Sequence, residues 1–263
     1  MFNYFLTKIL RALRYVLETE EQALLFHWGL AEKVGVIYNY VGEHAKKSKD
    51  IYQSFIQYCR LIEYLNNRLE YSTDLNEHIS IKLSQFGTHR YLVDRLAERM
   101  PKKCTLWIDA EGYDECHNQF SIARQIAKKS ECGVGLTIQL KSEWCLNDVI
   151  KCFKEGIKVR LCKGAYPKKG MTDFEALRKV REVIKLYKKM TEGHDGHDGH
   201  DCILEIATIK DMDLVMLAVE NELPLQVLYG WHKKFFNHPY GVTVYVPFGN
   251  RWLPYIKRRI RGK

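Results

Sequence analysis

The segment IKVRLCKG at residues 157–164 decides the fold that the sequence predicts. It opens with aliphatic and β-branched residues and becomes charged at Arg160 and Lys163, toward its carboxyl end. Short apolar runs of this kind are typical of strands in a parallel sheet, where both faces are covered. We therefore expect residues 157–164 to form one strand of an α/β fold.

Seven further segments share this pattern. They are VGVIYNYVG (34–42), ISIKLSQF (79–86), TLWIDA (105–110), VGLTIQL (134–140), CILEIAT (202–208), LQVLYG (225–230) and VTVYVPFG (242–249). Amphipathic segments between them predict helices, among them 91–99, 118–129, 173–190 and 212–221. Eight strands alternating with helices favour a closed (βα)8 barrel of the TIM type, and no GxGxxG motif follows a strand to indicate a dinucleotide-binding sheet instead. We expect one domain over residues 1–263, with an N-terminal helical extension.

The N-terminal residues 1–21, MFNYFLTKILRALRYVLETEE, interrupt their apolar run with Lys8, Arg11 and Arg14. This segment lacks a small-residue cleavage site and does not resemble a signal peptide. No stretch of the chain approaches the roughly 18 consecutive apolar residues of a transmembrane helix. We predict an amphipathic helix and a cytoplasmic protein. The 8 cysteines include no CxxC pair, so a disulfide framework or structural zinc site gains little support.

The formal net charge of +9 is compatible with nucleic acid, an anionic membrane surface or an anionic ligand. The lysines and arginines are spread along the whole chain, and no helix-turn-helix, zinc-finger or RNA-binding signature accompanies them. A diffuse basic balance is usually a solvated surface. We therefore expect no nucleic-acid partner. Nothing in the sequence indicates the oligomeric state.

A perfect triplet repeat, GHDGHDGHD, occupies residues 193–201. Alternating His and Asp can bind transition metals, but triplet expansion explains such a repeat without any function. We place it in a loop between a helix and a strand, outside the catalytic site, and assign no metal to the site.

Polar side chains gather toward the carboxyl ends of the predicted strands. They are Glu43, Lys82, Asp109, Gln139, Arg160, Lys163, Thr208, Tyr229 and Tyr245. In a (βα)8 barrel these ends meet on one face, where active sites of this architecture are built. Any single one of these residues could instead cap a helix or bond a loop. Together they predict a functional site.

The C-terminal segment WLPYIKRRIRGK begins at Trp252 and carries Tyr255, Arg258 and Arg259. Tyr255 and Arg259 are four residues apart and share a face of a predicted helix, with Arg258 beside them. Two guanidinium groups near a barrel mouth can clamp a carboxylate. The segment taken alone could equally be a solvated basic tail.

Several blocks resemble, in order, the signature segments of the proline dehydrogenase family. They are ISIKLSQFG (79–87), IDAEG (108–112), VRLCKGAY (159–166), IAT (206–208), LQVLYG (225–230), VYVPFG (244–249) and WLPYIKRRI (252–260). The resemblance runs from about residue 34 to the C-terminus. It implies a barrel that binds FAD and oxidises L-proline to Δ1-pyrroline-5-carboxylate, passing electrons to a quinone or another acceptor, with peripheral contact to a membrane.

The resemblance also implies roles for individual residues. Asp109 and Arg160 match catalytic positions, and Glu43 matches an acidic gate that can pair with Arg258. Lys82, Arg258 and Arg259 match the cations that bind the substrate carboxylate, with Tyr245 and Tyr255 as pocket walls. The implied flavin contacts are Ala110, Gln139, Arg160, Lys163, Gly164, Ala165, Tyr166, Thr208, Ile209 and Gln226.

Two alternatives stay open, and the first comes from two departures from the family pattern. Ile209 stands where the family usually has His, and Gly262 stands where a Glu is typical. One alternative is a divergent protein that binds FAD or proline without turnover. The other is a Schiff-base aldolase-like barrel that uses Lys82 or Lys163 as its nucleophile, because a strand-end lysine can be activated by desolvation.

Overall fold

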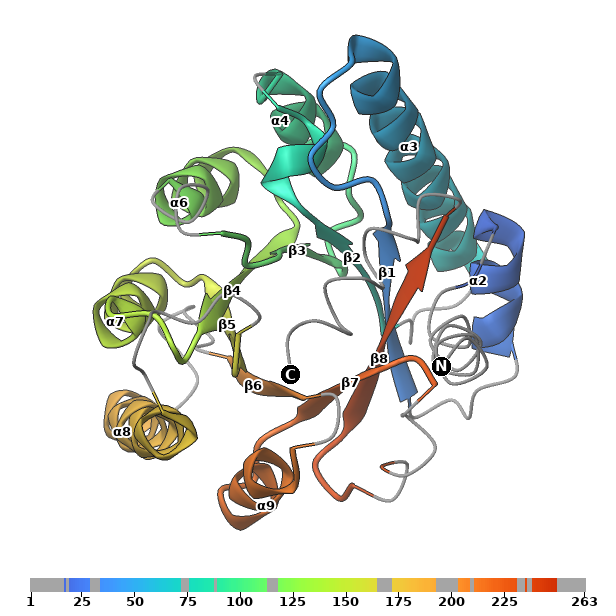
Figure 1. Cartoon of the computed structure of the whole chain (residues 1–263). Coiled ribbons are helices and arrows are strands. Elements are labelled where there is room, and N and C mark those ends of the chain that lie inside the picture. Colours follow the sequence, from blue (N-terminus) through green and yellow to red (C-terminus); the bar gives the residue numbers. More distant parts are fainter. Residues whose placement is uncertain are drawn as a thin grey trace, which may run out of the picture.

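The computed structural model forms a closed barrel of eight parallel strands in chain order, β1 to β8 (Figure 1). It describes residues 17, 19–28, 34–71, 76–87, 89–112, 118–164, 172–192, 203–208, 211–230, 235 and 238–249. The strands are β1 (Val34–Tyr40), β2 (Glu77–Ile81), β3 (Thr105–Ile108), β4 (Gly133–Gln139), β5 (Lys158–Cys162), β6 (Leu204–Thr208), β7 (Leu225–Leu228) and β8 (Val242–Phe248). β8 pairs with β1 and closes the barrel. All eight predicted strands and the (βα)8 architecture are confirmed.

Helices surround the barrel on its outer side (Figure 1). They are α2 (Glu20–Trp28), α3 (Ser48–Tyr71), α4 (Tyr91–Ala97), α6 (Gln119–Lys129), α7 (Cys145–Lys154), α8 (Asp173–Thr191) and α9 (Met212–Glu220). The four helices predicted at 91–99, 118–129, 173–190 and 212–221 correspond to α4, α6, α8 and α9. Within the described ranges, none of the helices is both long enough and apolar enough to cross a membrane.

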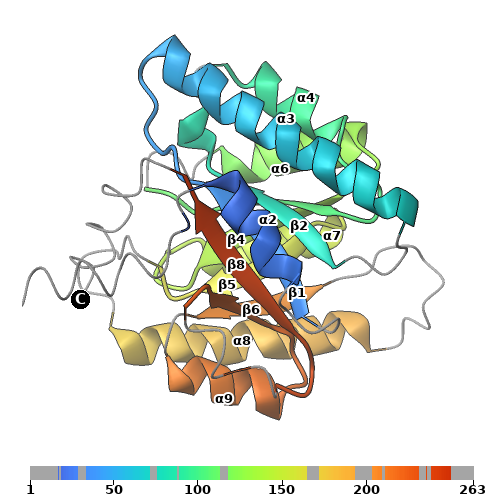
Figure 2. The ribbon, with the colours of Figure 1, turned by 90° about the vertical axis from the view of Figure 1, so that its right-hand side faces the viewer.

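The helix expected over residues 1–21 falls largely outside the described residues. The described segment beside it begins at Leu17, which forms a parallel bridge with Phe248 at the end of β8. Leu17 donates its N–H to the Pro247 carbonyl at 2.9 Å and accepts from the Gly249 N–H at 2.8 Å. Helix α2 follows and lies beside β8 (Figure 2). Leu17 and α2 are thereby attached to the strand that closes the barrel.

The strand predicted at 79–86 is too long. β2 ends at Ile81, and Leu83–Gln85 forms a short 3-10 helix, η1. The side-chain oxygen of Gln85 accepts the Lys82 N–H at 2.8 Å and the Tyr58 hydroxyl at 2.9 Å. The chain therefore turns after Ile81 because the Gln85 side chain satisfies the backbone N–H of Lys82. The strand predicted at 202–208 likewise begins later, at Leu204.

Alternate residues of each strand face opposite sides of the barrel wall. Val242, Val244 and Val246 of β8 belong to the apolar core between the strands and the helices. Tyr245, between them, hydrogen-bonds Asp109 across the barrel interior. The apolar core is thus a shell outside the barrel, and the interior is free to hold polar side chains.

A tryptophan fills part of this interior. Trp107 of β3 is 1% exposed and lies in register with Gly135 of β4. A Cβ atom at position 135 would lie 2.6 Å from Cδ2 of the indole. Only glycine leaves room for the ring there. The guanidinium carbon of Arg160 lies 4.8 Å from the centre of the same ring.

We expect Gly135→Ala to lower the free energy of unfolding by about 1–3 kcal/mol, because the added methyl group overlaps a buried indole that has little space to move. Gly133→Ala, in the same strand, is the control. The Cβ atom added there would have Thr105 Oγ1 as its nearest neighbour, at 3.0 Å, so the free energy of unfolding should fall by less. Urea unfolding measures both. Equal losses in the two variants would contradict this account of Trp107.

Candidate functional site

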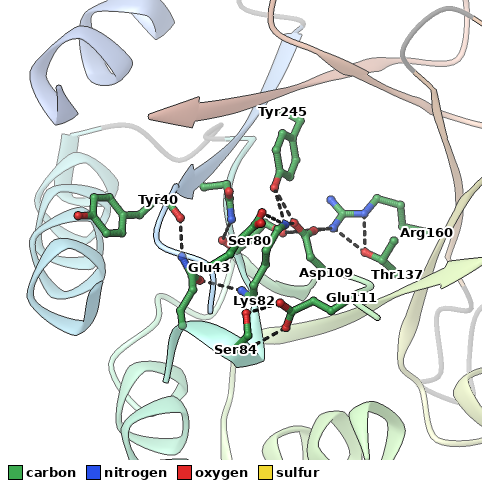
Figure 3. A network of polar contacts seen from close by, with 12 residues as sticks. Tyr40, Glu43, Ser80, Lys82, Ser84, Asp109, Glu111, Thr137, Arg160 and Tyr245 are labelled. Carbon is green, nitrogen blue, oxygen red and sulfur yellow. Dashed lines mark hydrogen bonds and ion pairs between the residues drawn. The ribbon is translucent and has the colours of Figure 1, made fainter. Parts of the chain in front are cut away.

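The carboxylate of Asp109 is the centre of a polar cluster at the carboxyl ends of the strands (Figure 3). Asp109 directly follows β3 and is 6% exposed. Its Oδ1 accepts hydrogen bonds from Ser80 Oγ, at 2.6 Å, and from Arg160. Its Oδ2 accepts from Lys82 Nζ and from the Tyr245 hydroxyl. Two cations and two hydroxyl groups therefore surround one buried anion.

Arg160 of β5 is held from several sides and is 2% exposed. Its Nε and Nη2 atoms donate to Thr137 Oγ1, at 2.8 and 2.6 Å, and Nη1 donates to Gln226 Oε1 at 2.8 Å. The guanidinium group lies over the Trp107 ring and 5.6 Å from the centre of the Tyr245 ring. This arrangement gives the cation a fixed position in the barrel.

The charges of this cluster set the protonation of Asp109. Burial alone would raise the pKa of Asp109, but Lys82 and Arg160, with hydrogen bonds from Lys82 and Ser80, hold it well below its ordinary value. A carboxylate with so low a pKa stays ionised at neutral pH and is a weak proton acceptor. Asp109 is therefore suited to anchoring cations rather than to removing protons.

Lys82 connects this cluster to the loop after β1. Its Nζ atom pairs with Asp109 and lies 3.7 Å from Glu43 Oε1 and 3.4 Å from the Tyr245 hydroxyl. The side chains of Lys82 and Glu43 are both largely buried. Glu43 thus lies beside the cluster, where it forms an ion pair with Lys82.

The loop that carries Glu43 is tied to the ends of β2 and β3 through Ser84. The Ser84 N–H donates to Glu111 Oε2 at 2.9 Å, and Ser84 Oγ accepts the His44 N–H at 3.0 Å. Burial raises the pKa of Glu111, and the hydrogen bonds from Ser84 oppose that rise. The Glu111 carbonyl accepts from Gln139 Nε2 at 2.9 Å. One network therefore spans the rim from the Glu43 loop to the end of β4.

The Gln139 side chain packs against the backbone of Gly164. Gly164 has a φ of +98°, and a Cβ atom there would lie 2.7 Å from Gln139 Oε1. The position favours glycine for both reasons. Ala110 follows Asp109 on the same rim. Gln139, Gly164 and Ala110 thus line the rim beside the Asp109 cluster.

Two predicted residues turn toward the helices instead. Lys163 Nζ donates to Asp211 at 2.9 Å and pairs with Asp173 at 2.5 Å. Burial acts to lower the pKa of Lys163, but its bonds to these two carboxylates raise it above the ordinary value. Thr208 Oγ1 accepts the Asp211 N–H at 2.9 Å, just before α9 begins. The sequence had left open that a strand-end residue only caps a helix, and Thr208 makes such a contact.

The structure therefore brings together six of the predicted residues: Glu43, Lys82, Asp109, Arg160, Gln226 and Tyr245. Other predicted residues lie outside the described residues. They are Ala165, Tyr166, Ile209, Tyr255, Arg258, Arg259, Gly262 and the repeat at 193–201. Within the described ranges, His, Cys, Asp and Glu side chains form no group of three that could hold a metal ion.

Sequence reasoning missed Ser80, Ser84, Trp107, Glu111 and Thr137. Three of these could have been found from strand alternation. Ser80 stands two residues before Lys82, Trp107 two before Asp109, and Thr137 two before Gln139, so each shares the inward face of its strand. Ser84 and Glu111 lie beyond the strand ends, where alternation gives no signal.

The family model for proline dehydrogenase matches residues 29–192, which is more than half of the chain. "Proline dehydrogenase 1" of Bacillus subtilis strain 168 is 27% identical over 248 residues, covering 84% of this chain and 76% of that protein. "Proline dehydrogenase 2" of the same strain is 25% identical over 201 residues, covering 71% and 66%.

Two solved structures share the fold. Proline utilization A (PutA) from Bdellovibrio bacteriovorus, inactivated by N-propargylglycine, has a TM-score of 0.76 and 17% sequence identity over 96% of this chain. PutA from Corynebacterium freiburgense has a TM-score of 0.75 and 17% identity over 99% of this chain. This chain spans about a third of each PutA chain, 32% in both cases.

We expect Asp109→Asn to lower the free energy of unfolding by about 3 kcal/mol at pH 7, because it leaves Lys82 and Arg160 buried without their anion. The folded-state pKa of Asp109 is depressed, so its contribution is present above the unfolded value of about 3.9 and is lost as pH falls toward the folded value. The difference from wild type should therefore narrow only below about pH 4.

Asp148→Asn is the control for this experiment. Asp148 pairs with Lys151 at 3.5 Å on the exposed side of α7, and its loss should change stability by less than about 0.5 kcal/mol. Chemical unfolding at several pH values measures both variants. A difference between wild type and Asp109→Asn that has already closed at pH 5 would contradict the low pKa of Asp109.

Proposed function

The chain belongs to the proline dehydrogenase family, and on that premise we propose that it oxidises L-proline to Δ1-pyrroline-5-carboxylate with FAD as its cofactor. The observation that carries the proposal is the buried cluster of Lys82, Asp109, Arg160 and Tyr245 at the mouth of the barrel. It combines fixed cations with an aromatic wall where the active sites of this architecture are built.

The residues at the strand ends fit a flavin. Gly164 leaves room for the Gln139 side chain to lie against the backbone, and that side chain offers an amide for hydrogen bonding. Arg160 supplies a buried cation with Gln226 behind it. Ala110, Lys163, Ala165, Tyr166, Thr208 and Ile209 complete the proposed cofactor-binding set. When bound, FAD supplies the two-electron acceptor that amino-acid side chains cannot provide.

We assign binding of the proline carboxylate to Lys82, Arg258 and Arg259. Ammonium and guanidinium groups make strong charge-assisted bonds to carboxylates, and the planar fork of arginine adds orientation. Lys82 is already held by Asp109 and Tyr245, so little order need be gained when proline binds. Tyr245 and Tyr255 are the proposed walls around the apolar part of the proline ring.

Arg160 is the residue that we expect to stabilise the negative charge formed during the reaction. Oxidation takes a hydrogen with its electron pair from C5 of proline while the nitrogen lone pair forms the C=N bond, and negative charge therefore develops on the accepting side. A buried cation that is already in position stabilises that charge without reorganisation. Asp109 fixes both cations as an ionised carboxylate. Glu43 is proposed to close the site by pairing with Arg258.

The geometry disfavours the aldolase-like alternative. A Schiff-base lysine needs a neutral amine, and such lysines are desolvated or placed beside other cations. Lys82 instead pairs with Asp109 and lies near Glu43, while the carboxylates around Lys163 raise its pKa. The non-catalytic alternative rests on Ile209 and Gly262. A measurement of whether the protein oxidises proline decides between it and the proposed function. We propose that the protein is cytoplasmic and passes electrons to a quinone or another acceptor at a membrane surface.

Purified protein should show the absorption of a bound flavin, and anaerobic L-proline should bleach it. The reason is that proline reduces the cofactor when no acceptor is present to reoxidise it. The measurement is a visible spectrum before and after proline, with D-proline as the control. Bound flavin that proline leaves oxidised would favour the non-catalytic alternative, and protein that binds no flavin would overturn the proposal.

We expect Lys82→Met to reduce kcat/KM for proline about 10- to 150-fold, because the loss of a charge-assisted contact costs about 1.5–3 kcal/mol. Arg259→Met should lose a similar factor. The flavin-to-protein ratio should stay near that of wild type in both, because flavin binding is assigned to other residues. Lys151→Met, on the surface of α7, is the control. Unchanged kinetics in Lys82→Met would remove Lys82 from the carboxylate site.

A further inference from the structure

Glu205 is an acidic residue inside the barrel that the proposed reaction does not use. Its neighbours in β6, Leu204 and Ile206, belong to the apolar core outside the barrel, so alternation turns Glu205 inward. In the sheet it lies in register with Arg160 of β5. A carboxyl group inside a barrel, one strand from a proposed catalytic cation, calls for a physical reason.

Gln226 connects Glu205 to Arg160. Its Nε2 atom donates to Glu205 Oε2, and its Oε1 atom accepts from Arg160 Nη1 at 2.8 Å. Gln226 is 2% exposed, so bulk water does not replace either contact. Glu205, Gln226 and Arg160 therefore form a continuous chain of hydrogen bonds across three neighbouring strands.

The contact with Glu205 selects the orientation of the Gln226 amide. A glutamine side chain can present either its oxygen or its NH2 group, whereas a guanidinium group only donates. The carboxylate oxygen of Glu205 accepts from the NH2 group and thereby turns the amide oxygen toward Arg160. With the amide reversed, two donors would face each other and a buried N–H group of Arg160 would lose its acceptor.

Gln226 contacts the guanidinium group of Arg160 on the side away from its other hydrogen-bond partners. Ser80, Asp109 and Thr137 accept from the guanidinium group on the side of β2, β3 and β4 (Figure 3). Gln226 accepts from the side of β7. Acceptors on two sides thus hold the guanidinium group in place. The orientation of the Gln226 amide decides whether an acceptor is present on the β7 side.

We propose that Glu205 is a positioning residue, which fixes the Arg160 guanidinium group through Gln226. The inference rests on the proposed function, in which Arg160 stabilises the charge that develops during proline oxidation. It extends the site by one residue that does not itself touch the cofactor or the substrate. Because Glu205 acts through Gln226, removing either residue should have the same consequence for Arg160.

The test is a double-mutant cycle of Glu205→Leu and Gln226→Leu. Each single variant should slow flavin reduction at saturating proline about 10-fold, with KM for proline changed less than about 3-fold, since the carboxylate is bound elsewhere. Each should also shift the absorption spectrum of the oxidised flavin in the same direction. The double variant should be no slower than Gln226→Leu alone. Additive losses would overturn the inference.

Two further variants keep the test decisive if leucine disturbs folding. Glu205→Gln preserves the volume and an oxygen that can accept from Gln226, and it should retain a rate within about 3-fold of wild type. A rate as low as that of Glu205→Leu would assign the effect to charge and overturn a positioning role. Thr243→Val, an inward position in register with Gln226, is the control and should leave rate and spectrum unchanged.

The outcomes also separate this inference from the function it rests on. If proline fails to reduce the flavin of the wild-type protein, the proposed function is wrong. If wild type is active and Glu205→Leu matches it in rate and spectrum, the proposed function stands and the positioning role of Glu205 is wrong.

Discussion

The ion pairs of one buried carboxylate, Asp109, constrain the rest of the site. Removing a carboxylate and two cations from water costs several kcal/mol for each ion, and the attraction between them offsets that cost only with good geometry. Asp109 meets this condition because each of its oxygens accepts from one cation and one hydroxyl group. The donors come from β2, β5 and β8, so the closed barrel is what brings them to a single point.

This constraint accounts for the distribution of polarity in the strands. An interior that holds charged groups cannot supply most of the hydrophobic stabilisation, which falls instead to the shell between strands and helices. The outward residues are therefore aliphatic and β-branched, as in Val242, Val244 and Val246. That pattern is local in the sequence, which is why eight strands could be predicted. The end of β2 could not, since the turn at η1 depends on the Gln85 side chain, which accepts the Lys82 N–H and is itself held by Tyr58 of α3.

The site was predictable to the extent that strand alternation determines it. Lys82 and Asp109 follow apolar strands, Arg160 lies within one, and all three face inward; the family resemblance named the same residues. Lys163 follows Arg160 by three positions and therefore faces the other way, toward Asp173 and Asp211 of the helical layer. Its partners lie at the starts of the helical segments that follow β5 and β6. The sequence thus shows that a strand ends in a charged residue. The side to which that side chain points depends on its place in the strand alternation and on the partners it meets in the folded chain.

The charges at the mouth of the barrel also bear on how the site would accept a zwitterion. Among the described residues of the cluster, Lys82 and Arg160 are balanced by Asp109 and Glu43. A substrate carboxylate adds one more negative charge, so the proposed site needs a further cation. Arg258 and Arg259 supply that charge in the proposed function. Pairing of Glu43 with Arg258 would then release Lys82 from one of its two carboxylates, leaving it better able to bind the carboxylate of proline.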